Sequence, residues 1–414
     1  MPGPNASKVK KVLPRIEIML WAIIVPEVII TWAVRQWLGA KAMEKEFITK
    51  YRKPNDAFKW TKKHGFFLQM GGFVLRRKGK PRRILEWEAL MRYYQQGRVT
   101  LSGITEAVID DRSKADGFSK SIALIQTSWF IIQSIARFSD NRFKLTQLEL
   151  VTATLALLSL PKYYFWWNKP FNAEVPVTIV LLNSPKKVGS HRDLPMQTHG
   201  NDILPFHAQA VSKFRTSILA GVEFVRSNLP TWDHVKKLAL IPMNVVMFVA
   251  HRINELTDPK LDYQASPMKV PLFYHSRRQS FLQGYTHPLQ IGGTPMQMLF
   301  GAIYCFGGWS DKIVFHTRTT SLLWRMSSVI ITAFPLVHMS PMIFVLVFKT
   351  RKVTEMPTSC IPLIGISAWL VLFSIPLYLI ARIILLILAF VELRYVPQGA
   401  LNTISWANAL PFIH

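Results

Sequence analysis

Several polar and ionisable residues lie inside segments that are otherwise apolar enough and long enough to cross a membrane. Such groups cost roughly 2.5–3.5 kcal/mol each in hydrocarbon on insertion scales, so they tend to face the interior of a helix bundle. Residues 118–138 carry four of them at the spacing of one helix face: Gln126, Trp129, Gln133 and Arg137. Glu149 follows in the next apolar segment, which a short turn must place alongside. The pattern predicts either a polar cavity with Gln126, Gln133, Arg137 and Glu149 as catalytic groups, or hydrogen bonds and ion pairs that only fix helix packing.

Three further charged residues belong to other apolar segments. Glu27 lies near the middle of the first segment, Arg325 near the start of a later one, and Arg382 deep in the last. We expect them, with Trp129, either to contact a substrate or to pair between helices. Trp166 closes the segment that contains Glu149, and its ring is expected either to face a cationic substrate or to belong to an interfacial aromatic belt.

His64 is the histidine set among aromatic residues beside a strongly basic stretch. Its ordinary pKa near 6.5 suits a general acid or base at neutral pH, so we include it among the catalytic candidates. The alternative interpretation is a packed or helix-capping histidine.

A cluster of aspartates precedes the segment 118–138 and comprises Asp110, Asp111 and Asp116. Paired carboxylates near a membrane can hold Mg²⁺, and the ion in turn a diphosphate, as in the Asp-rich motifs of prenyltransferases. Here the spacing departs from Asp-Asp-x-x-Asp, and positions i and i+6 do not share a helix face. An acidic turn that caps the following helix is the competing interpretation. The sequence establishes no cofactor, and Mg²⁺ is the one for which these aspartates offer candidate ligands.

The remaining chemistry-bearing residues exclude several classes of site. The chain has two cysteines, Cys305 and Cys360, too few for a disulfide framework or a thiolate metal site. The formal net charge is +26, but no zinc-finger, basic-zipper or RNA-binding signature accompanies it, so nucleic acid is not the expected partner. Lys and Arg that gather opposite anionic lipid headgroups explain the charge, and membrane lipid is the expected partner.

The elements that must position these residues are long apolar helices. Runs of about twenty apolar residues suffice to cross the ~30 Å hydrocarbon core. The candidate spans are 16–38, 118–138, 143–167, 294–309, 321–348 and 361–391, with 235–250 undecided. The predicted fold is therefore all-α: a polytopic transmembrane helix bundle of about six to seven spans.

The distribution of charge between spans predicts the orientation and the domain organisation. Residues 39–117 hold eighteen Lys or Arg against nine acidic residues, which predicts a cytosolic loop with interfacial helices. Residues 168–293 form a second cytosolic region, long enough to fold into a cap. We expect residues 1–414 to form one integral membrane domain, located in the endoplasmic reticulum or another endomembrane.

Residues 60–73 read Trp-Thr-x-x-His-x-Phe-Phe-x-x-Met-Gly-Gly-Phe, and residues 32–37 and 166–170 read Trp-Ala-Val-Arg-Gln-Trp and Trp-Trp-Asn-Lys-Pro. As a set these motifs resemble a family of uncharacterised fungal multi-pass membrane proteins. The resemblance implies a fungal source and an endomembrane setting, and it carries no general activity. The sequence departs from the family at Tyr304, where the relatives tend to have His.

The aromatic lining and the buried polar groups favour one function over another. We expect a membrane-embedded enzyme of fungal secondary metabolism that acts on a lipophilic small-molecule substrate, with isoprenoids as the first class to consider and cyclase- or transferase-like chemistry. The alternative is an ion channel or transporter, in which the same polar groups would line a pathway. A closed pocket would favour the enzyme, and a continuous water-filled pore would favour conduction.

Overall fold

The computed structural model describes residues 8–52, 58–77, 80–113, 117–140, 142–171, 173, 175–182, 248, 252, 270, 273–274, 288–348 and 361–401. These residues are mostly helical, as predicted. The chain divides into two compact units, of which the first comprises 1–183, 254–333 and 379–414 and the second 184–253 and 334–378. The sites described below belong to the first unit. The undecided segment 235–250 and most of the predicted cap 168–293 lie outside the described residues.

The predicted first span is a broken helix. Helix α1 covers Lys8–Ile24 and helix α2 covers Pro26–Glu46, and the two are bent by 112° at the break. Pro26 disfavours helical geometry at the residue before it, and Val25 accordingly has φ −135° and ψ 64°. Pro26 itself starts α2, where its missing N–H is tolerated. A short π-helix, Phe47–Tyr51, continues α2.

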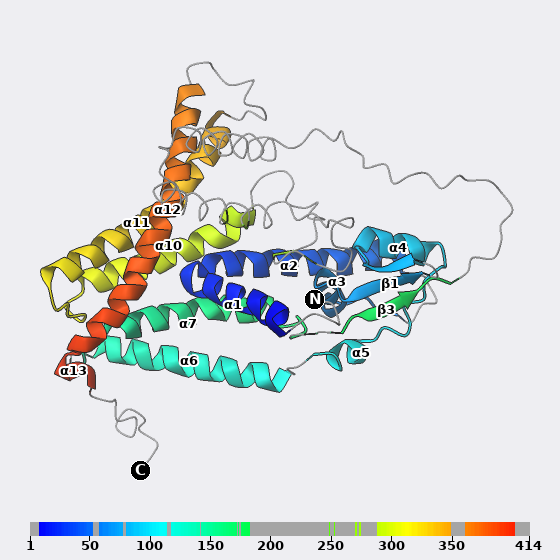
Figure 1. Ribbon diagram of the computed structural model, residues 1–414, viewed down its shortest axis with the longest axis horizontal. Helices are drawn as coiled ribbons and strands as arrows, with labels where there is room; N and C mark the ends of the chain where they lie inside the picture. Colours follow the sequence, from blue (N-terminus) through cyan, green and yellow to red (C-terminus); the bar gives the residue numbers. More distant parts are fainter. Residues whose placement is uncertain are drawn as a thin grey trace, which may run out of the picture. The chain divides into compact units, whose positions relative to one another are not determined.

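Helices α6 and α7 form the antiparallel hairpin that the sequence predicts. Helix α6 covers Gly117–Ser139 and helix α7 covers Gln147–Phe165, and they run side by side in Figure 1. Thr146 caps α7 by accepting a hydrogen bond from the Glu149 amide at 3.1 Å. Helix α2 packs on α7 as well, so three helices share one core.

A small sheet interrupts the predicted all-helical fold. Strands β1 (Phe73–Arg77), β2 (Lys80–Ile84) and β3 (Val177–Val180) are ordered β2-β1-β3, with β1 antiparallel to β2 and parallel to β3. Helices α3 (Lys62–Gln69), α4 (Trp87–Gln95) and α5 (Glu106–Asp110) accompany the sheet.

The aromatic residues between positions 58 and 75 belong to a hydrophobic core formed by this sheet and its helices. Trp60, Phe67 and Phe73 are fully buried there, with Trp87 against Trp60 at 4.9 Å between ring centroids. Their sequence predicts a helix that lies in the headgroup region of a membrane. A run of aromatic and basic residues suits such a helix, but it also suits a helix whose aromatic side chains pack into a protein core. Their burial in a protein core explains the aromatic residues without lipid contact.

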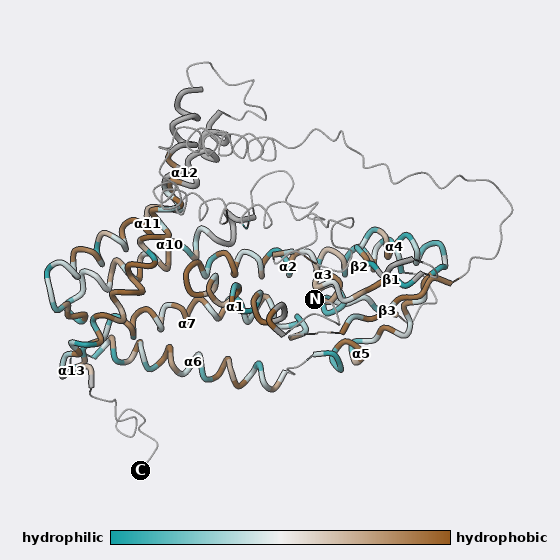
Figure 2. The backbone as a smooth tube through the Cα atoms, in the orientation of Figure 1, coloured by the Kyte–Doolittle hydropathy of each residue, from teal (hydrophilic) through white to brown (hydrophobic). Residues whose placement is uncertain are grey.

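The remaining elements are long apolar helices. They are α10 (Pro288–Trp309), α11 (Arg318–Phe348) and α12 (Ile361–Val391), followed by a 3₁₀ turn, Glu392–Tyr395, and a short helix α13, Gln398–Leu401. Within the described residues, two helical segments are long and apolar enough to cross a membrane, Arg318–Val337 and Ser374–Tyr395, or three if the bent pair α1–α2 counts as one. Figure 2 shows the apolar character of these helices.

Candidate functional site

Lys169 places its ammonium group between two indole rings. Helix α7 ends at Phe165, and the turn that follows brings Lys169 back beside α2. The Lys169 Nζ lies 3.9 Å from the ring centroid of Trp166 and 4.3 Å from that of Trp32. It donates a hydrogen bond of 2.9 Å to Gln36 Oε1. The residue is partly exposed, so the aromatic cage formed by Trp32 and Trp166 is not sealed.

Hydrogen bonds fix both walls of the cage. Trp166 Nε1 donates to Gln36 Oε1 at 3.1 Å, and Trp32 Nε1 donates to the Tyr274 carbonyl at 3.0 Å. Gln36 Nε2 donates to the same carbonyl at 2.9 Å. The two indoles meet edge to face at 5.1 Å between ring centroids. Because Trp32 and Gln36 are one helical turn apart on α2, one face of that helix supplies a wall and the hydrogen-bond acceptor.

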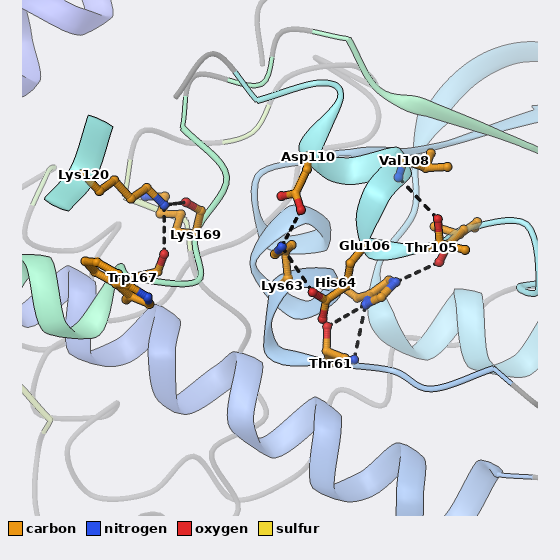
Figure 3. A network of polar contacts seen from close by, with 11 residues as sticks. Thr61, Lys63, His64, Thr105, Glu106, Val108, Asp110, Lys120, Trp167 and Lys169 are labelled. Atoms are coloured by element: carbon orange, nitrogen blue, oxygen red, sulfur yellow. Dashed lines mark hydrogen bonds and ion pairs between the residues drawn. The ribbon is translucent and has the colours of Figure 1, made fainter. Parts of the chain in front are cut away.

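The surroundings act on the charge of the Lys169 amine in two directions, because burial disfavours the ammonium ion whereas the two indole faces stabilise it. Burial, and secondarily the charge of Lys120, lower the pKa of Lys169 to about 7. Lys120 Nζ donates to the backbone carbonyls of Trp167 and Lys169, at 2.8 Å each (Figure 3). A lysine that is largely neutral at physiological pH can accept a proton or attack an electrophile, which an ordinary lysine cannot do readily.

A second polar cluster joins α3 to α5. Lys63 Nζ lies 2.7 Å from Asp110 Oδ2 and 3.2 Å from Glu106 Oε2 (Figure 3). Burial acts to lower the pKa of Lys63, but the two carboxylates outweigh it, and the pKa is raised above its usual value. Burial likewise acts to raise the pKa of Glu106, and hydrogen bonds from Thr61 and Lys63 turn the net shift downward. Lys63 and Glu106 are therefore charged at neutral pH, and Lys63 joins the Glu106 and Asp110 carboxylates in one ion-pair network.

His64 is placed as a capping residue of α3. Its Nε2 lies 2.8 Å from the Ile104 carbonyl and must carry the proton, while Nδ1 accepts from the Thr61 amide at 3.3 Å. Burial lowers the pKa of His64, so the ring is neutral and both nitrogens have partners. A pocket of about 290 Å³ lies beside it, lined in part by Phe58, Thr105 and Glu106. His64 could take a proton from a substrate only if its Nδ1 first lost the hydrogen bond from the Thr61 amide.

The hairpin brings together only part of the predicted catalytic set. Arg137 Nε lies 2.9 Å from Glu149 Oε1, as predicted, and the Arg137 guanidinium also donates to the Ala400 carbonyl at 2.8 Å. Gln133 is half-buried, whereas Gln126 and Trp129 are exposed on the outer face of α6. Gln126 and Trp129 therefore do not meet Arg137 and Glu149 in one cavity.

Other residues that were predicted to contact a substrate instead form ion pairs or hydrogen bonds between helices. Arg382 on α12 lies 3.1 Å from Glu27 on α2, and both side chains are buried. The Arg382 guanidinium also lies 3.6 Å over the ring of Phe300. Arg325 on α11 donates to the Gly308 carbonyl on α10 at 2.8 Å. Of the predicted substrate contacts, Trp166 is the one that belongs to the Lys169 site.

The two described aspartates of the cluster have different surroundings, and the third lies outside the described residues. Asp110 pairs with Lys63, Asp111 is exposed, and Asp116 lies outside the described part of the chain. No group of three or more His, Cys, Asp or Glu suited to a metal ion occurs among the residues described.

The sequence interpretation missed Lys169, Gln36 and Trp32, which complete the site around Trp166. The available signal was the pair of motifs at 32–37 and 166–170, each with two tryptophans beside a polar residue that can form hydrogen bonds. Which of those tryptophans face each other depends on how α2 packs on α7, and the local sequence does not specify this.

Residues 1–187 match the model of a family of unknown function, DUF8562. The match includes Trp32, Gln36, Trp166 and Lys169. It agrees with the expected resemblance to an uncharacterised family. A search of curated proteins and a search of solved structures each found no match to the chain. Over its first 187 residues the chain is thus similar to a family whose function is unknown.

Proposed function

We propose that this protein is a membrane-bound enzyme that acts on a lipophilic substrate, with the amine of Lys169 as its reactive group. The observation that carries the proposal is the placement of the Lys169 amine between the indoles of Trp32 and Trp166, with Gln36 as its side-chain acceptor. Burial, which lowers the pKa of Lys169 to about 7, supports the same proposal. Strongly perturbed pKa values cluster at catalytic sites. A lysine that served only as an ion-pair partner would face a carboxylate, whereas the side-chain acceptor of the Lys169 amine is the neutral amide of Gln36.

The cage also fits the lipophilic part of the proposal. Indole rings offer a large apolar surface to a hydrocarbon chain, and their faces stabilise a developing positive charge. An isoprenoid, whose reactions pass through cationic carbon, would use both properties. The neutral amine of Lys169 would then remove the proton that ends such a reaction.

Access from the membrane is supported by the outer face of α6. Large apolar side chains recur there every three or four residues and are exposed: Phe118, Ile122, Ile125, Trp129, Ile132 and Ile135. A stripe of this kind, the length of a 23-residue helix, is the surface expected against lipid. We therefore propose that α6, α7 and α10 are embedded alongside the two candidate spans, in a bundle of six or seven spans.

The setting that we propose is an endomembrane of a fungal cell, such as the endoplasmic reticulum, with a role in secondary metabolism. The support is the set of sequence motifs together with the basic composition of residues 39–117, which favours the cytosolic side of a membrane. A channel or transporter is the alternative outcome of the experiment that follows.

The decisive experiment compares lipid extracts of a heterologous host that makes the wild type, Lys169→Met or Lys41→Met. Lys41 is a matched control, because it lies on α2 and its Nζ is 5.0 Å over a single indole, Trp37, but the residue is exposed. The wild type and Lys41→Met should yield the same new lipid-soluble compounds by mass spectrometry. Lys169→Met should yield none while reaching the membrane in equal amount.

Equal products from Lys169→Met and the wild type would exclude Lys169 as the reactive group. If the purified wild type carried ions across liposome membranes and the host made no lipid-soluble product, the protein would be a channel or transporter and not an enzyme.

A further inference from the structure

Helix α1 turns back beside α2 instead of extending it. The two helices are bent by 112° at their break and contact each other, and Figure 1 shows α1 beside α2. Trp21, near the end of α1, is buried, and its ring meets Phe273 edge to face at 5.8 Å between ring centroids. Because the bend exceeds 90°, the start of α1 points back towards the C-terminal end of α2.

Another side of α1 is an apolar surface that the described part of the chain leaves uncovered. Its side chains recur at intervals of one helix face and are exposed: Val9, Val12, Leu13, Ile16, Leu20 and Ile23. Helices of this kind bury such a face against a partner. The charges of the same helix indicate what the partner is.

The charged residues of α1 are gathered towards its start. Four basic residues precede its acidic residue, Glu17: Lys8, Lys10, Lys11 and Arg15. The charge-free stretch that follows, 18–26, ends before Glu27 and would rise about 14 Å as a helix. That is about half of the ~30 Å hydrocarbon core, so the stretch fits one leaflet. Basic residues beside an apolar face are the pattern of a helix held by anionic headgroups and acyl chains.

We infer that α1 is an anchor in a single leaflet, which enters the membrane from the side of residues 39–117 and binds acidic phospholipid there. The N-terminus and residues 39–117 then lie on the same side, as expected for two basic segments. The inference rests on the proposed membrane location and replaces the continuous first span predicted for residues 16–38. The proposed bundle then counts six spans when the undecided segment 235–250 is one of them.

Cysteine labelling of the full-length chain in sealed membrane vesicles tests the side of the N-terminus. A chain with both native cysteines replaced by Ala carries Ala6→Cys, Gln95→Cys or Arg142→Cys, and a membrane-impermeant maleimide is applied before and after detergent. Ala6 precedes α1 by two residues. Gln95, exposed on α4, reports the side of residues 39–117, and Arg142, exposed in the turn between α6 and α7, reports the opposite side.

Ala6→Cys should react in the same vesicles as Gln95→Cys, whereas Arg142→Cys should behave in the opposite way. If Ala6→Cys instead reacted together with Arg142→Cys, α1 and α2 would cross the membrane as one span, and the inference would be overturned. If Gln95→Cys and Arg142→Cys reacted from the same side, α6 would not cross the membrane, and the proposed bundle would fail together with the inference.

A fluorophore on Leu20→Cys tests the lipid contact separately. Vesicles of phosphatidylcholine and phosphatidylserine are prepared with brominated acyl chains on one lipid or the other, at equal mole fractions. Brominated phosphatidylserine should quench the fluorophore more strongly, because basic residues concentrate acidic lipid around α1. Changing Lys8, Lys10 and Lys11 together to Gln should remove the difference. Equal quenching in the unsubstituted helix, or none, would overturn acidic phospholipid as the partner of this face.

Discussion

At the scale of single residues, two basic side chains have no carboxylate partner within the described part of the chain: Lys169, which follows α7, and Arg35 on α2. Arg35 is 2% exposed, its Nε has no hydrogen-bond partner, and no ion pair to it is seen among the described residues. A buried charge of this kind costs several kcal/mol. We interpret both residues as groups kept for function at the expense of stability.

Replacing Arg35 tests this interpretation directly. Arg35→Met keeps the aliphatic stem and removes the charge, so the free energy of unfolding should rise by about 1–4 kcal/mol. Arg382→Met is the matched control, because its charge is paired with Glu27, and it should lower the free energy of unfolding by about 3–5 kcal/mol. Thermal unfolding in detergent measures both variants. A loss of stability in Arg35→Met as large as that in Arg382→Met would show that Arg35 has a structural role.

At the scale of elements, periodicity and short turns predict the helices well and long-range pairing poorly. The α6–α7 hairpin and the Arg137–Glu149 contact follow from two apolar runs joined by a tight turn. The break at Val25 has a local cause in Pro26, although the apolar run continues through it. Strand β3 follows β1 by about a hundred residues, and their pairing is set by tertiary contact. No local signal in residues 73–77 specifies that partner.

The same division applies to the candidate site. Trp166 is recognisable as an aromatic residue at the end of an apolar segment, but its partner Trp32 lies on a helix 134 positions earlier. Helical spacing predicts that Gln126 shares an inner face with Arg137, yet Gln126 is exposed. Such spacing shows which residues share a face, and only the packing of α6 on α7 shows which face is turned inward.

The Glu27–Arg382 ion pair connects helix α2 to helix α12. Glu27→Gln leaves the Arg382 guanidinium buried beside a neutral amide, and it should cost about 3–5 kcal/mol of unfolding free energy. The double variant Glu27→Gln with Arg382→Met removes both charges and should be more stable than either single variant. The readout is the unfolding midpoint of all four proteins in one detergent. Additive losses in the double variant would mean that the two charges do not act as a pair.

At the scale of the whole molecule, the proposed membrane location explains why long apolar helices are exposed. The described part of the chain has exposed apolar side chains on α6, α11 and α12, while the sheet with α3 and α4 has an apolar core of its own. A membrane-embedded part and a part outside it would explain this division. The lipophilic substrate would then reach Lys169, which follows the end of α7, from the membrane.

The depth of α6 in a bilayer tests this division. A fluorophore on a cysteine at Ile125, in a chain with Cys305 and Cys360 replaced by Ala, should be quenched by lipids with a quencher near the acyl-chain ends. The same fluorophore at Gln95, exposed on α4, should not respond to those lipids. Equal quenching at both positions, or at neither, would contradict a lipid-facing α6.

The titration of Lys169 is the sharpest test of a reactive amine between Trp32 and Trp166. The rate at which a small acylating reagent modifies Lys169 is measured by peptide mass spectrometry from pH 5 to 11, with Lys41 as the internal reference. Only the neutral amine reacts, so the rate reports the fraction deprotonated. A midpoint near pH 7 at Lys169 is predicted, because burial and Lys120 disfavour the charged form. A midpoint near the ordinary lysine value of about 10.4 would contradict a reactive amine in the cage of Trp32 and Trp166.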